Sequence, residues 1–134
     1  MLLDRGGLKV MDYGLARIIG LPGLTTSNTY LGTPSYSAPE AAVAGEVDQQ
    51  SDMYSLGIIL YRMLTGQLPF RSTNPLEVLQ MHCTKPLPAL PPVLAIPEEV
   101  QRMVQVLTAK NKADRYPDAE SFLIDMNTVL NHLP

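Results

Sequence analysis

The chain has 134 residues, enough for one domain that buries roughly two-thirds of its unfolded surface. A net charge of −3 and the absence of a Lys/Arg cluster argue against binding to nucleic acid. A single cysteine excludes an internal disulfide, and neither a signal peptide nor a membrane span is predicted, so we expect a cytoplasmic protein.

Residues 2–15 are expected to form a β-hairpin. Asp4-Arg5-Gly6-Gly7 is a turn signal, and apolar Leu8 and Val10 flank polar Lys9 after it. An isolated hairpin is barely stable in water, so this one needs a partner surface. Residues 18–37 follow with many Gly, Thr, Ser, Asn and Pro residues and no apolar period, which predicts a long loop. Such a loop is either functional or a plain flexible linker.

The first of four predicted helices covers residues 52–65. This stretch is apolar nearly all round, which indicates a central buried helix. We expect Ser51 or Asp52 as its N-cap and Gly66 at its end.

Three further helices are predicted. Asn74-Pro75 opens one that runs to about residue 83. Apolar residues recur at helical spacing in 98–110 and 117–133, which predicts the other two. The proline-rich segment 85–97, between the helix that ends near residue 83 and the one at 98–110, is expected to be irregular. The chain is therefore predicted to be mainly α, with a β-hairpin at its front.

Several short motifs occur in a fixed order along the chain. Asp12-Tyr13-Gly14 alone is most often a turn, but GTPSYSAPE follows at residues 32–40, and SDMYSLGIILYRMLTGQLPF and ADRYPDAESFL come later. Chance does not plausibly supply this series at these separations. The chain resembles the C-terminal part of a eukaryotic-like serine/threonine protein kinase, and SDMYSLG and RYPDAESF are similar to bacterial members.

This resemblance implies a protein-kinase-like C-lobe fragment with a β-hairpin stub, an activation loop and about four to five helices. Residues 1–15 would hold the hairpin and the Asp-Tyr-Gly triplet. Residues 16–40 would be the activation segment, and residues 41–134 the helical substrate lobe.

The resemblance also implies roles for individual residues. Asp12 matches the metal-binding aspartate of the family's Asp-Phe-Gly triplet, with Tyr13 in place of phenylalanine. Thr33 matches the threonine that hydrogen-bonds the catalytic aspartate and lysine in serine/threonine kinases. Residues 31–36 would form the floor under the substrate residue that follows the acceptor. The implied substrate-binding residues are Leu31, Gly32, Thr33 and Tyr36.

Five residues match structural positions of the family. Glu40 and Arg115 match an ion pair that ties the end of the activation segment to the last helices, although either residue alone would be read as a solvated surface charge. Asp52 matches an aspartate that accepts hydrogen bonds from the catalytic loop, and its competing reading is a plain N-cap. Ile59 and Met63 match positions under the adenine-binding residues, though core packing is their simplest reading.

The hydroxyl-rich part of the loop matches the region where this family is commonly autophosphorylated. A phosphate there could order the loop against arginines, and Arg17 matches a basic position that reads it. The plainer reading is a soluble loop. The candidate phosphorylation sites are Thr25, Thr26, Ser27 and Thr29.

The parent kinase implied by the resemblance transfers the γ-phosphate of ATP to serine and threonine of protein substrates, with Mg²⁺. The glycine-rich loop, strand lysine, helix glutamate and His-Arg-Asp loop that this chemistry needs are not in these 134 residues. We therefore expect the chain alone to be inactive, to bind ATP and Mg²⁺ weakly at best, and to self-associate through exposed core.

The alternative is a stand-alone, non-catalytic substrate-lobe module that binds proteins or regulates a full kinase. His82-Cys83 lacks a second ligand pair, which argues against a zinc site.

Overall fold

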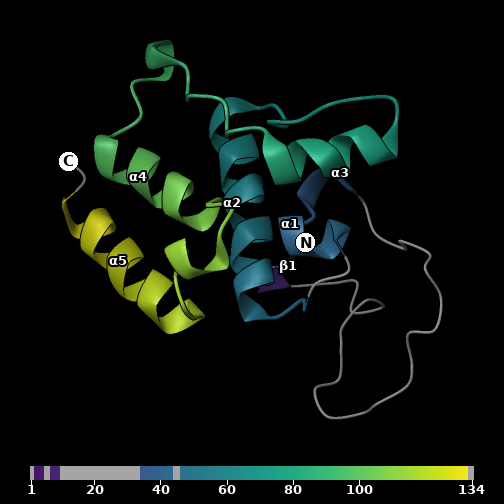
Figure 1. Cartoon of the computed structure of the whole chain (residues 1–134). Coiled ribbons are helices and arrows are strands. Elements are labelled where there is room, and N and C mark those ends of the chain that lie inside the picture. The colour runs from purple at the N-terminus through teal and green to yellow at the C-terminus, as the bar shows by residue number, and fades with distance from the viewer. Residues whose placement is uncertain (1, 5–6, 10–33, 44–45, 133–134) are drawn as a thin grey trace. The chain divides into compact units, whose positions relative to one another are not determined.

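The computed structural model describes residues 2–4, 7–9, 34–43 and 46–132 (Figure 1). The chain divides into two compact units, Met1–Gly32 and Thr33–Pro134. In the first unit, strands β1 (Leu2–Asp4) and β2 (Gly7–Lys9) pair in antiparallel fashion, with Leu3 opposite Leu8. The predicted hairpin is thereby confirmed over these strands, and its expected continuation to residue 15 lies outside the described residues.

The second unit is helical, which confirms the mainly α prediction. Its described part contains five α-helices, and the one that the sequence pattern did not predict is the short helix at Pro39. The α-helices are α1 (Pro39–Ala42), α2 (Gln49–Thr65), α3 (Pro75–Thr84), α4 (Glu98–Leu107) and α5 (Ala119–His132), and the 3₁₀ helices are η2 (Pro34–Tyr36), η3 (Pro92–Leu94) and η4 (Lys112–Asp114).

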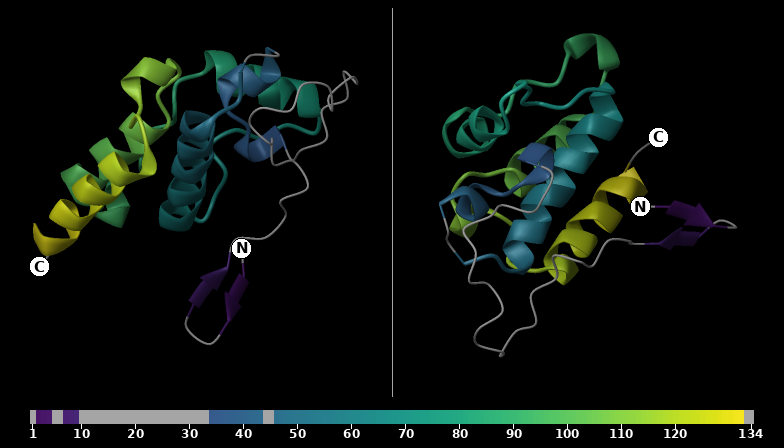
Figure 2. Two further views of the ribbon diagram at one scale, coloured as in Figure 1. Left: turned by 90° about the horizontal axis from the view of Figure 1, so that it is seen from below. Right: turned by 90° about the vertical axis from the view of Figure 1, so that its right-hand side faces the viewer.

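Helix α2 lies at the centre of this unit. Figures 1 and 2 show it between the pair α4 and α5 on one side and α1 and α3 on the other. Helix α4 packs against both α2 and α5, whereas η2 packs against α2 and α3. The proline-rich connection between α3 and α4 is irregular apart from η3, as its composition predicts.

Helix α2 begins a turn earlier than predicted, so the expectation that Ser51 or Asp52 caps it is wrong. The N-cap is Asp48, whose carboxylate accepts from the backbone N–H groups of Gln50 and Ser51 at 3.0 and 3.3 Å. The Ser51 hydroxyl accepts from the Asp48 N–H at 3.2 Å and completes a capping box. The first turn has no apolar residue, and a tertiary contact holds it, because the Gln50 side chain donates to the Lys112 carbonyl at 3.0 Å.

The C-terminal end of α2 is as predicted, but the helix is less buried than predicted. Gly66 ends the helix with φ = 73°, and its N–H donates to the Arg62 carbonyl at 2.8 Å. One face is buried, with Tyr54 and Ile58 fully inaccessible, whereas Met63 on another face is 75% exposed. In the described part of the chain α2 is therefore central but not buried all round.

The remaining helices begin or end where side chains form hydrogen bonds with backbone groups. Asn74 caps α3 as predicted, and its side chain accepts from the Leu76 N–H at 3.0 Å. Helix α4 ends at Leu107, short of the predicted residue 110, because the next backbone carbonyls bind an arginine instead of continuing the helix. Helix α5 starts at Ala119 rather than 117, because the Asp118 carboxylate accepts from the Ser121 N–H at 2.7 Å.

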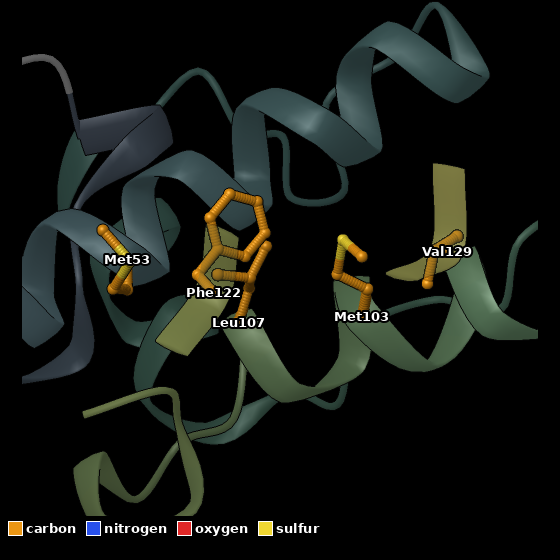
Figure 3. Packing of buried hydrophobic residues seen from close by; sticks show 5 residues of the cluster. All are labelled: Met53, Met103, Leu107, Phe122 and Val129. Atoms are coloured by element: carbon orange, nitrogen blue, oxygen red, sulfur yellow. The ribbon is translucent and has the colours of Figure 1, made fainter. Parts of the chain in front are cut away.

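Two clusters of buried apolar side chains hold the helices together. The first joins α2, α4 and α5 and is shown in Figure 3; its members are Met53, Met103, Leu107, Phe122 and Val129. The second joins the start of α1 to α2 through Ala38, Tyr54 and Ile58, with Tyr36, Leu68 and Leu87 packed around them.

Gly57 lets α2 and α4 approach closely. A Cβ atom on Gly57 would lie 2.7 Å from the Leu107 Cβ and 2.7 Å from the Thr108 Cγ2, which is closer than side chains pack. The position therefore admits only glycine unless the helices move apart.

Among the described residues, none of the helices combines the length and apolar character that crossing a membrane requires.

Candidate functional site

The candidate site lies where residues 34–40 cross helix α2. η2 leads through Ser37 and Ala38 into α1, and the two short helices pack against α3 while η2 also contacts α2. Ala38 is buried, so this segment is part of the second core cluster and not a surface loop.

A single stripe of α2 holds Tyr36. The Ser55 hydroxyl donates to the Tyr36 backbone carbonyl at 2.8 Å. The Tyr36 ring packs against the cluster that contains Ile58, and the Arg62 guanidinium donates to the Tyr36 hydroxyl. Residues 55, 58 and 62 share one helix face because they follow i, i+3, i+7 spacing. The tyrosine is therefore fixed from its backbone to the tip of its side chain.

Glu40 and Arg115 form a bidentate ion pair. The Arg115 Nη1 and Nη2 atoms donate to the two Glu40 carboxylate oxygens at 2.8 and 3.0 Å. The Arg115 side chain is fully buried and that of Glu40 is 12% exposed. The pair joins the start of α1 to the segment between η4 and α5, 75 residues later in the chain.

Every N–H group of Arg115 has an acceptor. Besides the two bonds to Glu40, Nη1 donates to the Gln50 carbonyl at 3.0 Å, Nη2 to the Lys110 carbonyl at 3.1 Å, and Nε to the Ala109 carbonyl at 2.7 Å. Since a guanidinium has five N–H donors, all of its hydrogen-bonding capacity is used. This explains how the charge tolerates full burial.

The Glu40 carboxylate is kept ionised by its partners. Burial acts to raise the pKa of Glu40, but hydrogen bonds from Arg115 and from the Ser51 hydroxyl, which lies 2.5 Å from Oε1, lower it below its ordinary value. The pair is therefore charged at neutral pH.

A second polar network lies beside this ion pair. The Tyr54 hydroxyl lies 2.9 Å from His82 Nδ1, and Lys110 Nζ donates to the Tyr54 oxygen at 3.3 Å. Arg115 lies over the Tyr54 ring, with its Cζ 4.9 Å from the ring centroid, and Lys110 Nζ lies 4.8 Å from the centroid of Phe70. These contacts connect α2, α3 and the turn after α4.

The donor pattern assigns the His82 tautomer. Lys110 can only donate, so the Tyr54 oxygen accepts from it and the Tyr54 O–H donates to Nδ1. Nε2 then carries the ring proton, and it meets no acceptor of good geometry within residues 34–43 and 46–132. Burial and then Lys110 lower the pKa of His82 to about 4, although the nearby Ser35 backbone acts in the opposite direction. Burial also lowers the pKa of Lys110 to about 8.

Comparison with known proteins identifies the family to which the chain belongs. The protein kinase domain model matches residues 1–132. The chain belongs to the protein kinase family. It is 32% identical over 134 residues to the serine/threonine-protein kinase PknL of Mycobacterium tuberculosis, covering 99% of this chain and 34% of PknL. It is 34% identical over 129 residues to the probable serine/threonine-protein kinase PknB of Lactococcus lactis, covering 96% of this chain and 21% of that protein.

A third relative is the serine/threonine-protein kinase pkn3 of Myxococcus xanthus, 35% identical over 131 residues, which cover 91% of this chain and 24% of pkn3. All three are bacterial, which confirms the predicted resemblance. The chain spans about a third or less of the length of these relatives.

The kinase residues expected from the sequence fall into two groups. The structure brings Tyr36, Glu40 and Arg115 to one region around α2. The other predicted metal, substrate and phosphate residues lie outside the described residues; they are Asp12, Arg17, Thr25, Thr26, Ser27, Thr29, Leu31, Gly32 and Thr33.

Asp52 lies in the first turn of α2, exposed, and it does not cap the helix. Partial burial, and then the nearby Asp48 carboxylate, raise the pKa of Asp52. Ile59 is half-buried and Met63 is exposed, so core packing describes the first better than the second.

The described residues do not fit a metal centre by themselves. They contain no group of three or more His, Cys, Asp or Glu side chains that could hold a metal ion.

Sequence reasoning missed the network around Tyr54 and His82. His82 was considered only as a metal ligand, yet it follows Val78 and Leu79 at helical spacing, and all three are buried on one face of α3. That spacing was the available signal of a core histidine.

Proposed function

We propose that this chain supplies the substrate-binding part of a serine/threonine protein kinase, which transfers the γ-phosphate of ATP to hydroxyl groups of protein substrates. The observation that carries the proposal is the anchoring of residues 36–40. The Ser55 and Arg62 side chains of α2 donate hydrogen bonds to Tyr36, which also packs against the second core cluster, and the buried Arg115 holds Glu40.

Anchoring matters because phosphoryl transfer depends mainly on positioning. The enzyme must hold the acceptor hydroxyl in line with the γ-phosphate, and small misplacements reduce the rate strongly. A segment fixed by a fully satisfied arginine is suited to this task, since it offers the substrate a rigid surface.

The 134-residue chain is expected to lack phosphotransfer activity on its own. Its sequence contains no glycine-rich loop, strand lysine or His-Arg-Asp loop. When bound to the complete domain, Mg²⁺ would stabilise the charge that develops on the phosphates. Of this chain's residues, Asp12 would help to hold the metal.

One experiment tests the proposed role directly. The part of PknL that precedes the matched region is fused to this chain, and transfer from radiolabelled ATP to a protein substrate is measured. We expect phosphoserine or phosphothreonine from the fusion, none from the fusion carrying Asp12→Ala, and none from the 134-residue chain alone. Turnover by the chain alone that Asp12→Ala abolishes would refute its predicted inactivity.

A stand-alone binding or regulatory module remains the second candidate. Large apolar side chains are strongly exposed on several elements, among them Val43 at 71%, Met63 at 75% and Leu76 at 71%. Such exposure favours association with another copy or another protein. A chain that stays monomeric in light scattering at micromolar concentration and leaves the rate of a full-length kinase unchanged would exclude this candidate.

A further inference from the structure

The connection between α3 and α4 begins with a proline-rich segment, residues 85–91, whose sequence is KPLPALP. Every residue of this segment except Ala89 is a proline or precedes one. Proline fixes φ near −65° and disfavours the α-helical backbone in the residue before it, so such a sequence favours polyproline II. The structure agrees, because Lys85 (φ −88°, ψ 136°) and Pro91 (φ −60°, ψ 126°) both lie close to polyproline II angles.

Burial along the segment repeats every third residue. Leu87 and Leu90 are half-buried, and Leu87 packs against the second core cluster, whereas the other side chains of the segment are exposed. A polyproline II helix has three residues per turn, so residues three apart lie on one edge. The leucine edge therefore lies on the protein and the two other edges are open. The open edges carry Lys85, Pro88 and Pro91 on one and Pro86 and Ala89 on the other.

The segment is held at both of its ends. The Lys85 N–H donates to the Met81 carbonyl at 2.9 Å in α3, and the Pro91 carbonyl accepts from the Leu94 N–H at 3.0 Å in η3. Figure 1 and the right-hand view of Figure 2 show η3, just beyond the segment, projecting from the helices. A ligand that is already fixed in its extended conformation loses little entropy on binding.

The open edges offer apolar rings, backbone carbonyls and a positive charge. Proline rings pack against aromatic side chains, and the carbonyls of an extended chain accept from the N–H of tryptophan and the O–H of tyrosine. Pro88 and Pro91 have the PxxP spacing that aromatic-lined grooves bind. Lys85 lies on the same edge and forms no ion pair with a carboxylate in the described part of the chain. Val93, which follows in η3, is 88% exposed and extends the apolar surface.

The plainer explanation of the segment is a stiff connection between two helices. Prolines end a helix and limit the flexibility of the chain after it, which accounts for their presence. That explanation does not account for their placement. The leucines occupy the edge that contacts the protein, and the prolines and the lysine occupy the edges that face away from it.

We propose that residues 85–91 form a polyproline II docking site for a protein domain that has an aromatic-lined groove with a carboxylate at one end. The groove takes the two open edges, and the carboxylate pairs with Lys85. The inference goes beyond the proposed function and does not depend on it, because the segment takes no part in phosphate transfer.

The test measures binding of the 134-residue chain to purified SH3 domains by isothermal titration calorimetry. These domains have aromatic-lined grooves that bind PxxP segments, and the set is chosen for an acidic residue at one end of the groove. We expect saturable binding. Replacing Pro88 and Pro91 together by alanine should weaken it about tenfold or more, because both groove contacts and the preformed conformation are lost. Lys85→Glu should weaken it about three- to tenfold, since an exposed ion pair becomes a pair of like charges.

Ala89→Pro should change the affinity in the opposite direction. It places a proline at the one position of the segment that is neither a proline nor followed by one, and the Ala89 N–H donates to no backbone carbonyl in the described part of the chain. Stiffening the unbound segment should tighten binding about two- to fivefold. A variant that only damaged the fold would not bind more tightly, and weaker binding by Ala89→Pro would show that the segment is not bound as polyproline II.

Two variants outside the segment are the matched controls. Arg71→Glu reverses the charge of an exposed cation, and Pro117→Ala removes an exposed proline. Both should bind the domains as the unmodified chain does. Failure of every domain to bind, or undiminished binding after loss of Pro88 and Pro91, would overturn the proposal. If no domain binds and the loss of these prolines reduces self-association in light scattering, the segment contacts a second copy of the chain and the proposal is wrong.

Discussion

Arg115 shows how a single buried charge can be tolerated. Its side chain is fully buried, yet each N–H meets a carboxylate or carbonyl oxygen, and Glu40 neutralises its charge. Replacing such a pair by apolar residues can be nearly neutral, whereas removing one partner leaves a charge without compensation.

Glu40→Ala is therefore expected to lower the free energy of unfolding by about 3–5 kcal/mol. Urea denaturation of the chain measures this change, and Glu46→Ala, at an exposed carboxylate, should change stability by less than about 0.5 kcal/mol. A loss below about 1 kcal/mol in Glu40→Ala would mean that the pair contributes little to stability.

His82 makes stability depend on pH. Burial and Lys110 lower the pKa of His82 from 6.5 to about 4. The unfolded chain takes up a proton near pH 6.5 and the folded chain only near pH 4. The free energy of unfolding should therefore fall as the pH drops through this window, by up to about 1.4 kcal/mol per pH unit. The contribution of Glu40 is lost only below its ordinary pKa of 4.5, because its folded pKa is lowered.

Urea denaturation between pH 7 and pH 5 tests this prediction. In His82→Gln the free energy of unfolding should fall less between pH 7 and pH 5 than in the unmodified chain. Other titrating groups are the same in both proteins, so their effects cancel in the comparison. His132→Gln is the control, because His132 is exposed near the end of α5. Equal pH dependence in the unmodified chain and His82→Gln would show that His82 is not the group responsible.

Two aspartates at the start of α2 have different roles, since Asp48 caps the helix and Asp52 lies in its first turn. Asp48→Ala removes the capping box and an ion pair with Lys112, in which the atoms are 2.8 Å apart, and should cost about 1–2 kcal/mol. Asp52→Ala should change stability by less than about 0.5 kcal/mol, because the Asp52 side chain is exposed and is repelled by Asp48. Thermal denaturation followed by circular dichroism measures the stability of both variants. A larger loss of stability in Asp52→Ala than in Asp48→Ala would contradict the assignment of Asp48 as the cap.

Gly57 decides how closely α2 and α4 approach. Gly57→Ala should cost about 1–3 kcal/mol by overpacking, even though alanine is the better helix former by about 1 kcal/mol. Met63→Ala, on an exposed face of the same helix, should be nearly neutral. Stabilisation of the chain by Gly57→Ala would show that the helices separate at no cost.

The helices were predicted well where their signals are local. Asn74-Pro75 and Gly66 place the start of α3 and the end of α2 because capping depends on a few neighbouring residues. The predicted start of α2 was wrong although its signal is local, because the Asp48–Ser51 capping box precedes the apolar residues that defined the prediction. The predicted end of α4 was wrong because Arg115 binds the carbonyls of Ala109 and Lys110, and no helical pattern reveals that contact.

Across the full chain, the family motifs located the candidate site better than hydrophobic and capping patterns alone. Glu40 and Arg115 are 75 residues apart, and neither differs locally from a surface charge, so only the resemblance could pair them. The contact between Arg62 and Tyr36 and the buried His82 escaped prediction, because each requires knowing which helix face lies inward.

We propose that residues 36–40 form a fixed substrate platform of a protein kinase. The most direct test is to compare Michaelis constants for peptide and for ATP in the PknL fusion, with and without Tyr36→Ala, using His132→Gln as a control. We expect Tyr36→Ala to raise KM for the peptide by about fivefold or more and to leave KM for ATP unchanged. An unchanged KM for the peptide, or an equal rise in both constants, would contradict it.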